Sequence, residues 1–319
     1  MIHLLATGGT IAMQRSGAAG GNVPALDAAG LLALVGELDA EGGIRVEDWE
    51  RLPAVHRGPA GLWALRQRVA ELLGGREPPA GVVITHGTDT LEEVAYLLAR
   101  TLPPEVPVVL TGAMRTSSDA EWDGPRNLRD AVRVAASPES RGRGAMVVFG
   151  GRILDGRDVA KLNAFAPDAF ASPHSRQLGA VSEGGVRFTH GAEPQRALLA
   201  PPGLTRSVAL VPLQIGDEGA LLELARPHFD GVVIEAFGRG NSPPGILPSV
   251  HRWLADGKPV VLATRCAYGE VGGEYAFEGG GGQLLRLGVQ PAGPRSAALA
   301  RLELILCLAA GVPYGGVAP

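Results

Sequence analysis

The sequence predicts an α/β protein, with a doubly wound N-terminal domain built on a mostly parallel sheet and a smaller C-terminal α/β domain. Short apolar runs alternate with segments of helical periodicity over most of the chain. A proline-rich stretch interrupts this alternation, and 319 residues exceed the usual size of one domain. We therefore expect an N-terminal domain over 1–190, a linker over 191–206 and a C-terminal domain over 207–319.

The N-terminal domain is expected to hold buried strands, because several apolar runs end in Gly, Thr, Asp or Pro turn chemistry. Between these runs, leucines and valines spaced by three and four predict helices that each bury one face. The strands are Ile2 to Ala6, Ile44 to Glu47, Gly81 to Thr85, Val106 to Leu110 and Ala145 to Phe149, and the helical stripes are Leu31 to Leu38, Leu62 to Leu73, Leu91 to Leu98 and Leu128 to Ala135.

The C-terminal domain repeats the alternation on a smaller scale. A glycine run, Gly279 to Gly282, is expected to form a flexible turn. The predicted strands are Val208 to Pro212, Gly231 to Ala236 and Pro259 to Ala263, and the predicted helices lie near Leu221 to Ala225, Leu247 to Ala255 and Ala297 to Ala310.

Composition excludes several classes of protein. The 29 Lys plus Arg against 33 Asp plus Glu give a net charge of −4, which argues against a nucleic-acid partner. No apolar run approaches the roughly 20 residues of a membrane span. The apolar strand at Ile2 follows no basic leader segment, and cysteines are few, so we expect a cytoplasmic protein with Cys266 and Cys307 in its core.

The common catalytic motifs are missing from the sequence. It contains no GxxxxGK[ST] loop, no HExxH and no GxSxG, and its seven histidines lack the spacing of metal ligands. The turn at Thr7 to Thr10 also lacks the GxGxxG spacing of a dinucleotide site. These absences disfavour metal, serine-hydrolase and dinucleotide chemistry.

Threonines instead gather after three of the predicted strands. In an open parallel sheet the carboxyl ends of the strands are where ligands bind. Any single threonine there could be only a helix cap or a turn residue, but three clusters together favour a site. The clusters are Thr7 and Thr10, then Thr85, Thr88 and Thr90, then Thr111 and Thr116.

The segment from Thr85 to Glu93 places a hydroxyl beside a carboxylate where a strand turns into a helix. A capping box, with Asp89 or Thr90 as the cap and Glu92 or Glu93 reaching back, is the structural alternative. That alternative does not explain Gly87, which would let backbone approach a ligand. A free Asp89 carboxylate would bind a substrate ammonium group.

Two segments, 6–12 (ATGGTIA) and 84–90 (ITHGTDT), resemble the signature segments of bacterial-type L-asparaginases, amidohydrolases that release ammonia from asparagine and sometimes from glutamine. Similar blocks follow in the same order along most of the chain. The resemblance implies the two-domain α/β fold and a tetramer built from intimate dimers. The further blocks are Leu110 to Arg115, Asp123 to Leu128, Leu154 to Lys161 and Gly238 to Asn241.

The resemblance also implies roles for individual residues. Thr10 matches the nucleophile on a mobile lid, Thr88 the second active-site threonine, Asp89 the substrate-binding carboxylate and Lys161 the amine of a Thr-Lys-Asp arrangement. A lysine can serve as a base once desolvated whereas arginine cannot, and this chain has only two lysines. Backbone N–H groups at Gly9 and Gly87 are candidate oxyanion donors. Further substrate contacts are expected at Ala113 and, from a neighbouring subunit, at Asn241.

The sequence departs from the family pattern at two places. The family carries a tyrosine on the lid, but the matching place in this chain is near Val23. The family also carries a serine that binds the substrate carboxylate, and the matching segment 54–56 (AVH) contains no serine. His56 is one candidate replacement and a tyrosine, Tyr268 or Tyr275, another. Residues 17–21 suit either a closing lid or an exposed hairpin loop.

The sequence is therefore interpreted as an amidohydrolase that cleaves the side-chain amide of L-asparagine through a threonine nucleophile and an acyl-enzyme. We expect no cofactor and no metal, and a homodimer or homotetramer. Glutamine or another small amide is the alternative substrate. A non-catalytic amino-acid-binding homologue is the alternative from another class.

Overall fold

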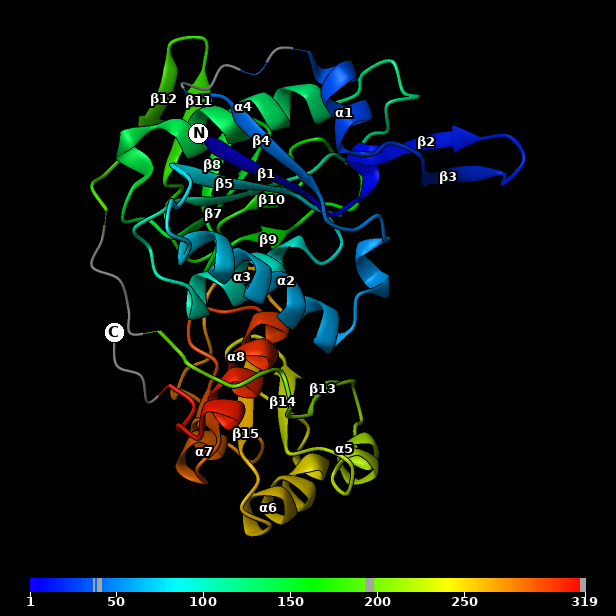
Figure 1. Cartoon of the computed structure of the whole chain (residues 1–319). Helices are drawn as coiled ribbons and strands as arrows, with labels where there is room; N and C mark the ends of the chain where they lie inside the picture. The colour runs from blue at the N-terminus through cyan, green and yellow to red at the C-terminus, as the bar shows by residue number, and fades with distance from the viewer. Residues whose placement is uncertain (37, 39–41, 193–197, 316–319) are drawn as a thin grey trace. The chain divides into compact units, whose positions relative to one another are not determined.

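A computed structural model describes residues 1–36, 38, 42–192 and 198–315, and the chain divides into two compact units between Leu198 and Leu199 (Figure 1). This division falls within the linker predicted over 191–206, of which 193–197 lie outside the described residues. Both units are α/β, and the prediction of a larger and a smaller parallel-sheet unit is confirmed.

The first unit is built on an eight-stranded sheet in the order β12-β11-β8-β7-β6-β5-β1-β4. Pairing is parallel from β4 to β7, and β8, β11 and β12 add an antiparallel edge that the sequence did not predict. The strands are β1 (Ile2–Ala6), β4 (Ile44–Asp48), β5 (Gly81–Thr85), β6 (Val108–Thr111), β7 (Ala145–Phe149), β8 (Arg152–Asp155), β11 (Gly179–Ser182) and β12 (Gly185–Phe188).

Helices cover both faces of this sheet, as a doubly wound fold requires (Figure 1). The helices α1 (Ala28–Val35) and α4 (Gly124–Ala136) bury leucine and valine stripes on one face. On the other face lie α2 (Pro59–Leu73) and α3 (Leu91–Thr101). The predicted stripes therefore form the core.

Two predicted boundaries in this unit are wrong. The strand expected from Val106 begins at Val108, because Pro107 has no N–H to donate to a ladder. The helix expected to reach Leu38 ends at Val35, where Gly36 takes a φ of 80° and caps it.

The order of the strands reverses at β1. The chain crosses from β1 to β4 on one side and then places β5 on the other side. The turns that follow β1 and β5 therefore start at the switch point where ligands bind in such sheets. After β1 come a short 3₁₀ turn, η1 (Thr10–Ala12), and the hairpin of β2 (Met13–Ser16) and β3 (Gly21–Pro24), which extends away from the sheet in Figure 1.

The second unit contains a parallel sheet in the order β13-β14-β15-β16. One face of it packs against α8, and the other face packs against α5 and α6. The elements are β13 (Val208–Pro212), β14 (Gly231–Ala236), β15 (Val260–Thr264), β16 (Gln290–Pro291), α5 (Ala220–Ala225), α6 (Leu247–Ala255), α7 (Gly281–Arg286) and α8 (Ala297–Ala310).

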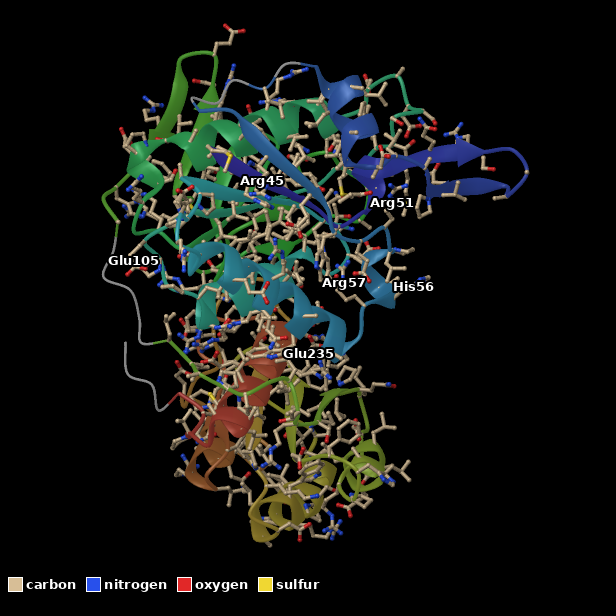
Figure 2. All side chains as sticks on the ribbon, in the orientation of Figure 1. Arg45, Arg51, His56, Arg57, Glu105 and Glu235 are labelled. Atoms are coloured by element: carbon tan, nitrogen blue, oxygen red, sulfur yellow. The ribbon has the colours of Figure 1, made fainter. Side chains whose placement is uncertain are left out.

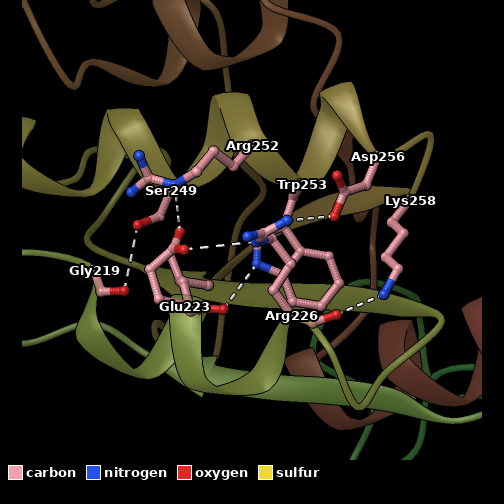
Figure 3. Close-up of polar contacts among 9 residues, drawn as sticks. Gly219, Glu223, Arg226, Ser249, Arg252, Trp253, Asp256 and Lys258 are labelled. Carbon is pink, nitrogen blue, oxygen red and sulfur yellow. Dashed lines mark hydrogen bonds and ion pairs between the residues drawn. The ribbon is translucent and has the colours of Figure 1, made fainter.

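Polar contacts fasten α5 to α6 within this unit (Figure 3). The buried Trp253 donates its indole N–H to the carbonyl of Leu222 at 3.0 Å. Lys258, one of the chain's two lysines, donates to the carbonyl of Arg226 at 2.5 Å and lies 5.5 Å from the Trp253 ring. Lys258 therefore has a structural role.

Two further predictions in the second unit are corrected. The glycine run is not a flexible turn, because Gly281 and Gly282 are buried and begin α7. A Cβ on Gly282 would lie 2.4 Å from the carbonyl oxygen of Gly273, so the run permits close packing. Cys266 is exposed rather than part of the core, whereas Cys307 is buried as predicted. No helix within the described ranges has the length and apolar character to cross a membrane.

Candidate active site

Glycine turns bring the two signature segments into contact at the switch point. Gly9 has a φ of 90°, and a Cβ there would lie 2.5 Å from the backbone N and Cα of Gly87. A Cβ on Gly87 would lie 2.6 Å from the Cβ of Ala54, and one on Gly112 would lie 2.5 Å from the carbonyl oxygen of His86. The turns after β1, β5 and β6 therefore meet backbone to backbone, and the turn before α2 meets them through the small side chain of Ala54.

Thr88, Asp89 and Lys161 form one hydrogen-bonded cluster beside these turns. The Lys161 Nζ lies 2.9 Å from the Thr88 Oγ1 and 2.7 Å from Asp89 Oδ1. Thr88 is buried, and the Lys161 side chain is 17% exposed, whereas that of Asp89 is 64% exposed. The geometry thus places an amine against a buried hydroxyl and leaves a carboxylate open to a ligand.

Glu92 holds Lys161 in place from α3. Lys161 is the last residue of the short strand β9 (Ala160–Lys161), which pairs with β10 (Phe170–Ala171). The backbone N–H of Lys161 donates to Glu92 Oε2 at 2.6 Å. Burial raises the pKa of Glu92 above its usual value. Thr90 stands at the start of α3 but makes no side-chain capping bond. Glu92 therefore anchors Lys161, and Thr90 does not complete a capping box.

Three other threonines of the clusters, Thr7, Thr111 and Thr116, form hydrogen bonds that hold strands or turns together. Thr7 donates its hydroxyl to the carbonyl of Thr85 at 2.9 Å, which ties β1 to β5. Thr111 donates to the carbonyl of Val148 at 2.7 Å, and Thr116 donates to Asp119 at 2.8 Å in a local turn. Thr10 is half-buried at the start of η1, next to Gly9. Thr10 and Thr88 directly follow Gly9 and Gly87, the two glycines whose backbones approach each other.

His86, between the strand β5 and Gly87, is fully buried. Its Nδ1 lies 2.8 Å from the carbonyl oxygen of Gly87, and its Nε2 lies 2.9 Å from Nη1 of Arg57. Burial, together with the nearby Arg57 charge, lowers the pKa of His86 to about 4. The imidazole is therefore neutral at physiological pH.

Arg57 is a contact of the site that the sequence did not point to. Its side chain is 1% exposed, whereas His56 next to it is exposed (Figure 2). Glu50 accepts from Arg57 Nε at 3.0 Å and from Nη2 at 2.7 Å. One available signal was Gly61, since a helical glycine often marks a close neighbour, and a Cβ there would lie 2.7 Å from Arg57 Cγ.

Other predicted residues lie as follows. Ala113 is fully buried directly after β6, next to Gly112. Val23 is half-buried in β3, opposite Gln14 of the hairpin that was predicted as a lid or exposed loop. In the second unit, the Asn241 Oδ1 accepts the N–H of Gly281 at 3.2 Å, and Tyr268 and Tyr275 are exposed.

The described part of the chain contains no group of three or more His, Cys, Asp or Glu side chains suited to hold a metal ion. The cluster of Thr88, Asp89 and Lys161 offers the chemistry of a hydroxyl next to an amine, and backbone N–H groups of the glycine turns lie nearby. An α/β fold with such a cluster at its switch point has the parts of a hydrolase that works through a nucleophile.

Comparison with known proteins is consistent with this class. The family description "Asparaginase, N-terminal" matches residues 1–194, and "Glutaminase/Asparaginase C-terminal domain" matches residues 207–314. The chain is 39% identical over 315 residues to a probable L-asparaginase of Deinococcus radiodurans, covering 97% of this chain and 93% of that protein. It is 40% identical over 274 residues to a glutaminase-asparaginase of Pseudomonas fluorescens biotype A, covering 82% and 75%.

A solved structure agrees with these matches. The probable cytoplasmic L-asparaginase of Campylobacter jejuni superposes with a TM-score of 0.82 at 30% identity, covering 96% of this chain and 94% of that one. The protein therefore belongs to the asparaginase family and is an amidohydrolase.

Proposed function

We propose that the protein hydrolyses the side-chain amide of L-asparagine to L-aspartate and ammonia. The observation that carries the proposal is the cluster in which the Lys161 Nζ lies 2.9 Å from Thr88 Oγ1 and 2.7 Å from Asp89 Oδ1. The names of the relatives from Deinococcus radiodurans and Campylobacter jejuni support asparagine as the substrate.

In the proposed reaction, the Thr10 hydroxyl attacks the carbonyl carbon of the side-chain amide. The Thr10 proton passes through the Thr88 hydroxyl to the Lys161 amine and from there to the leaving nitrogen, which departs as ammonia. Water then adds to the acyl ester, and aspartate leaves as Thr10 recovers its proton. Backbone N–H groups near Gly9 and Gly87 would stabilise the oxyanion.

Asp89 would hold the substrate's ammonium group. Its carboxylate is 64% exposed and Lys161 occupies only one oxygen of it, so the other oxygen can accept a hydrogen bond from a ligand. Ala113 follows Gly112, where a Cβ would lie 3.4 Å from Thr88 Cγ2, and its backbone would adjoin the same site.

A second candidate rests on the two departures from the family pattern. Val23 and Ala54 offer no hydroxyl, and exposed His56 is the remaining candidate for a substrate contact in the turn before α2. Since these positions are where substrate would be read, glutamine or another small amide is the alternative substrate, and the relative from Pseudomonas fluorescens is named a glutaminase-asparaginase. Binding of an amino acid without turnover is the alternative outside the enzyme class.

The test is ammonia release from L-asparagine and L-glutamine by the purified protein and by Thr10→Ala, Thr88→Ala and Val23→Tyr. We expect the wild type to act on asparagine and each threonine variant to lose that activity. Activity seen only in Val23→Tyr would show that the site is intact but lacks the tyrosine that activates the nucleophile. Silence in every variant would favour another amide or the binding protein.

We further propose a homodimer or homotetramer in the cytoplasm, with Asn241 contributed to a neighbouring subunit's site. The family resemblance supports the assembly, and the name of the Campylobacter jejuni protein supports the compartment. Light scattering after size-exclusion chromatography gives the mass of the assembly. Asn241→Ala should then reduce activity without changing that mass.

A further inference from the structure

The buried Arg57 faces the signature threonine segment from the turn before α2. Its Nη1 lies 2.9 Å from His86 Nε2, and its Nη2 lies 3.4 Å from the carbonyl oxygen of Thr7. The guanidinium also lies 5.3 Å from the centre of the Trp49 ring. One side chain therefore contacts both strand ends, β1 and β5, from which the candidate catalytic turns begin.

The contact with Arg57 decides the form of His86. A guanidinium can only donate, so the Nε2 that faces it must be unprotonated. The proton of the neutral ring then sits on Nδ1, which donates to the carbonyl of Gly87 at 2.8 Å. Glu50 neutralises the charge of Arg57 from the outer side, with its side chain 32% exposed.

The carbonyl of Gly87 belongs to the peptide that also carries the N–H of Thr88. A trans peptide is planar, so its N–H points opposite to its C=O. Fixing the carbonyl of Gly87 toward His86 therefore fixes the Thr88 N–H in the opposite direction. The Thr88 hydroxyl, which lies 2.9 Å from Lys161 Nζ, starts from the same backbone.

The fold makes room for this arrangement. The helical Gly61 faces Arg57 Cγ, where a Cβ would lie only 2.7 Å away. The backbone of His86 is fixed as well, since its N–H donates to the carbonyl of Thr111 at 2.8 Å. With the backbone of His86 held, the imidazole contact sets the orientation of the next peptide.

We propose that Arg57 is a positioning residue which, by holding His86 as the Nδ1–H tautomer, orients the Gly87–Thr88 peptide for catalysis. The proposal rests on the amidohydrolase function proposed above. Arg57 itself need not touch the substrate. Its loss should therefore lower kcat more than it changes KM, since a small misplacement of a catalytic group can reduce the rate on the order of 100-fold.

The chain offers a matched control in Arg66. That arginine is half-buried, lies 5.1 Å from the centre of the Trp63 ring, and donates to the hydroxyl and carbonyl of Thr101 at the far end of α3. Arg57→Met and Arg66→Met each remove a stacked, hydrogen-bonded guanidinium. Only the first change removes the contact with His86.

The test measures kcat and KM for ammonia release, and the tautomer of His86 by ¹⁵N NMR of the imidazole. We expect kcat to fall about 10- to 100-fold in Arg57→Met with KM within about threefold. Arg57→Lys, which keeps a cationic donor, should restore most of the loss, and Arg66→Met should stay near the wild type. An equal loss in both methionine variants, or no recovery in a folded Arg57→Lys, would overturn the proposal.

The NMR measurement remains decisive if a variant does not fold or if the wild type does not release ammonia. In the wild-type protein at neutral pH, His86 should carry its proton on Nδ1 alone. An Nε2–H tautomer or an imidazolium there would refute the positioning role. Absence of ammonia release, with the expected tautomer present, would instead refute the proposed function.

Discussion

Replacing Lys161 by Met should separate catalysis from stability. The ion pair with Asp89 is partly exposed, because the carboxylate is 64% and the lysine side chain 17% exposed. Exposed pairs are worth at most about 1 kcal/mol. Since Asp89 stays solvated when its partner is lost, the melting temperature should fall by no more than about 2 to 4 °C.

Activity should fall much further. The Lys161 Nζ lies 2.9 Å from the Thr88 Oγ1, within reach for proton transfer. Loss of a general base typically reduces kcat by about 10²- to 10⁴-fold. Lys161→Arg keeps the positive charge but cannot take up a proton, so it should be about as inactive as Lys161→Met.

The assay is ammonia release from L-asparagine combined with calorimetry of each variant. Lys258→Met is the matched control, because it removes the chain's other lysine, which binds the carbonyl of Arg226. That control should keep full activity. If Lys161→Arg retained activity within tenfold of the wild type, the lysine would not be acting as a base.

Two further predictions concern side chains around the cluster. The pKa of His86 in the folded protein is about 4, below the ordinary 6.5 of the unfolded chain. Between these pH values the unfolded chain binds a proton on this histidine that the folded protein does not. The free energy of unfolding should therefore fall by on the order of 3 kcal/mol as the pH falls from about 6.5 toward 4. Urea unfolding should show this slope in the wild type and in the exposed-site control His251→Gln, but not in His86→Gln; equal slopes in all three would contradict the assignment. Glu92→Leu removes the acceptor of the Lys161 N–H, so kcat should fall roughly 10- to 100-fold. Glu92→Gln keeps an acceptor and should recover most of the rate, and a glutamine variant as slow as the leucine variant would show that the hydrogen bond is not what matters.

Periodicity predicted the main strands and helices because the buried faces of a doubly wound sheet leave long apolar stripes. The strands Ile2–Ala6 and Gly81–Thr85 lie where they were expected. The antiparallel edge was not predicted, because strands such as Gly185–Phe188 are short and only half-buried. Such strands carry little apolar signal.

The residues of the candidate site likewise include some that the sequence predicted and one that it did not. Thr88 and Asp89 stood out as a hydroxyl and a carboxylate at a strand end, and Lys161 was selected through the family resemblance. The structure places the three together. Arg57 was not selected, because the one local signal, the helical Gly61, does not tell which side chain faces it. Its importance comes from tertiary contacts with His86 and Glu50 that no local pattern encodes.

Two positions depart from the family pattern, Val23 in place of a tyrosine and Ala54 in place of a serine, and sequence spacing does not show which side chain replaces them. Val23 lies in the β2–β3 hairpin, where it pairs with Gln14. Ala54 packs against Gly87, which leaves little space for a larger side chain there. Ammonia release by the wild type, compared with Val23→Tyr, tests whether the site works without the lid tyrosine.

The central claim is that a threonine hydroxyl attacks the amide carbonyl of asparagine. The most direct measurement is rapid acid quenching during turnover, followed by mass spectrometry of the protein and its tryptic peptides. We predict an added aspartyl group on the peptide 1–15, which contains Thr10, and its absence in Thr10→Ala. Steady ammonia release with the aspartyl group on another peptide, or with unchanged turnover in Thr10→Ala, would contradict the account.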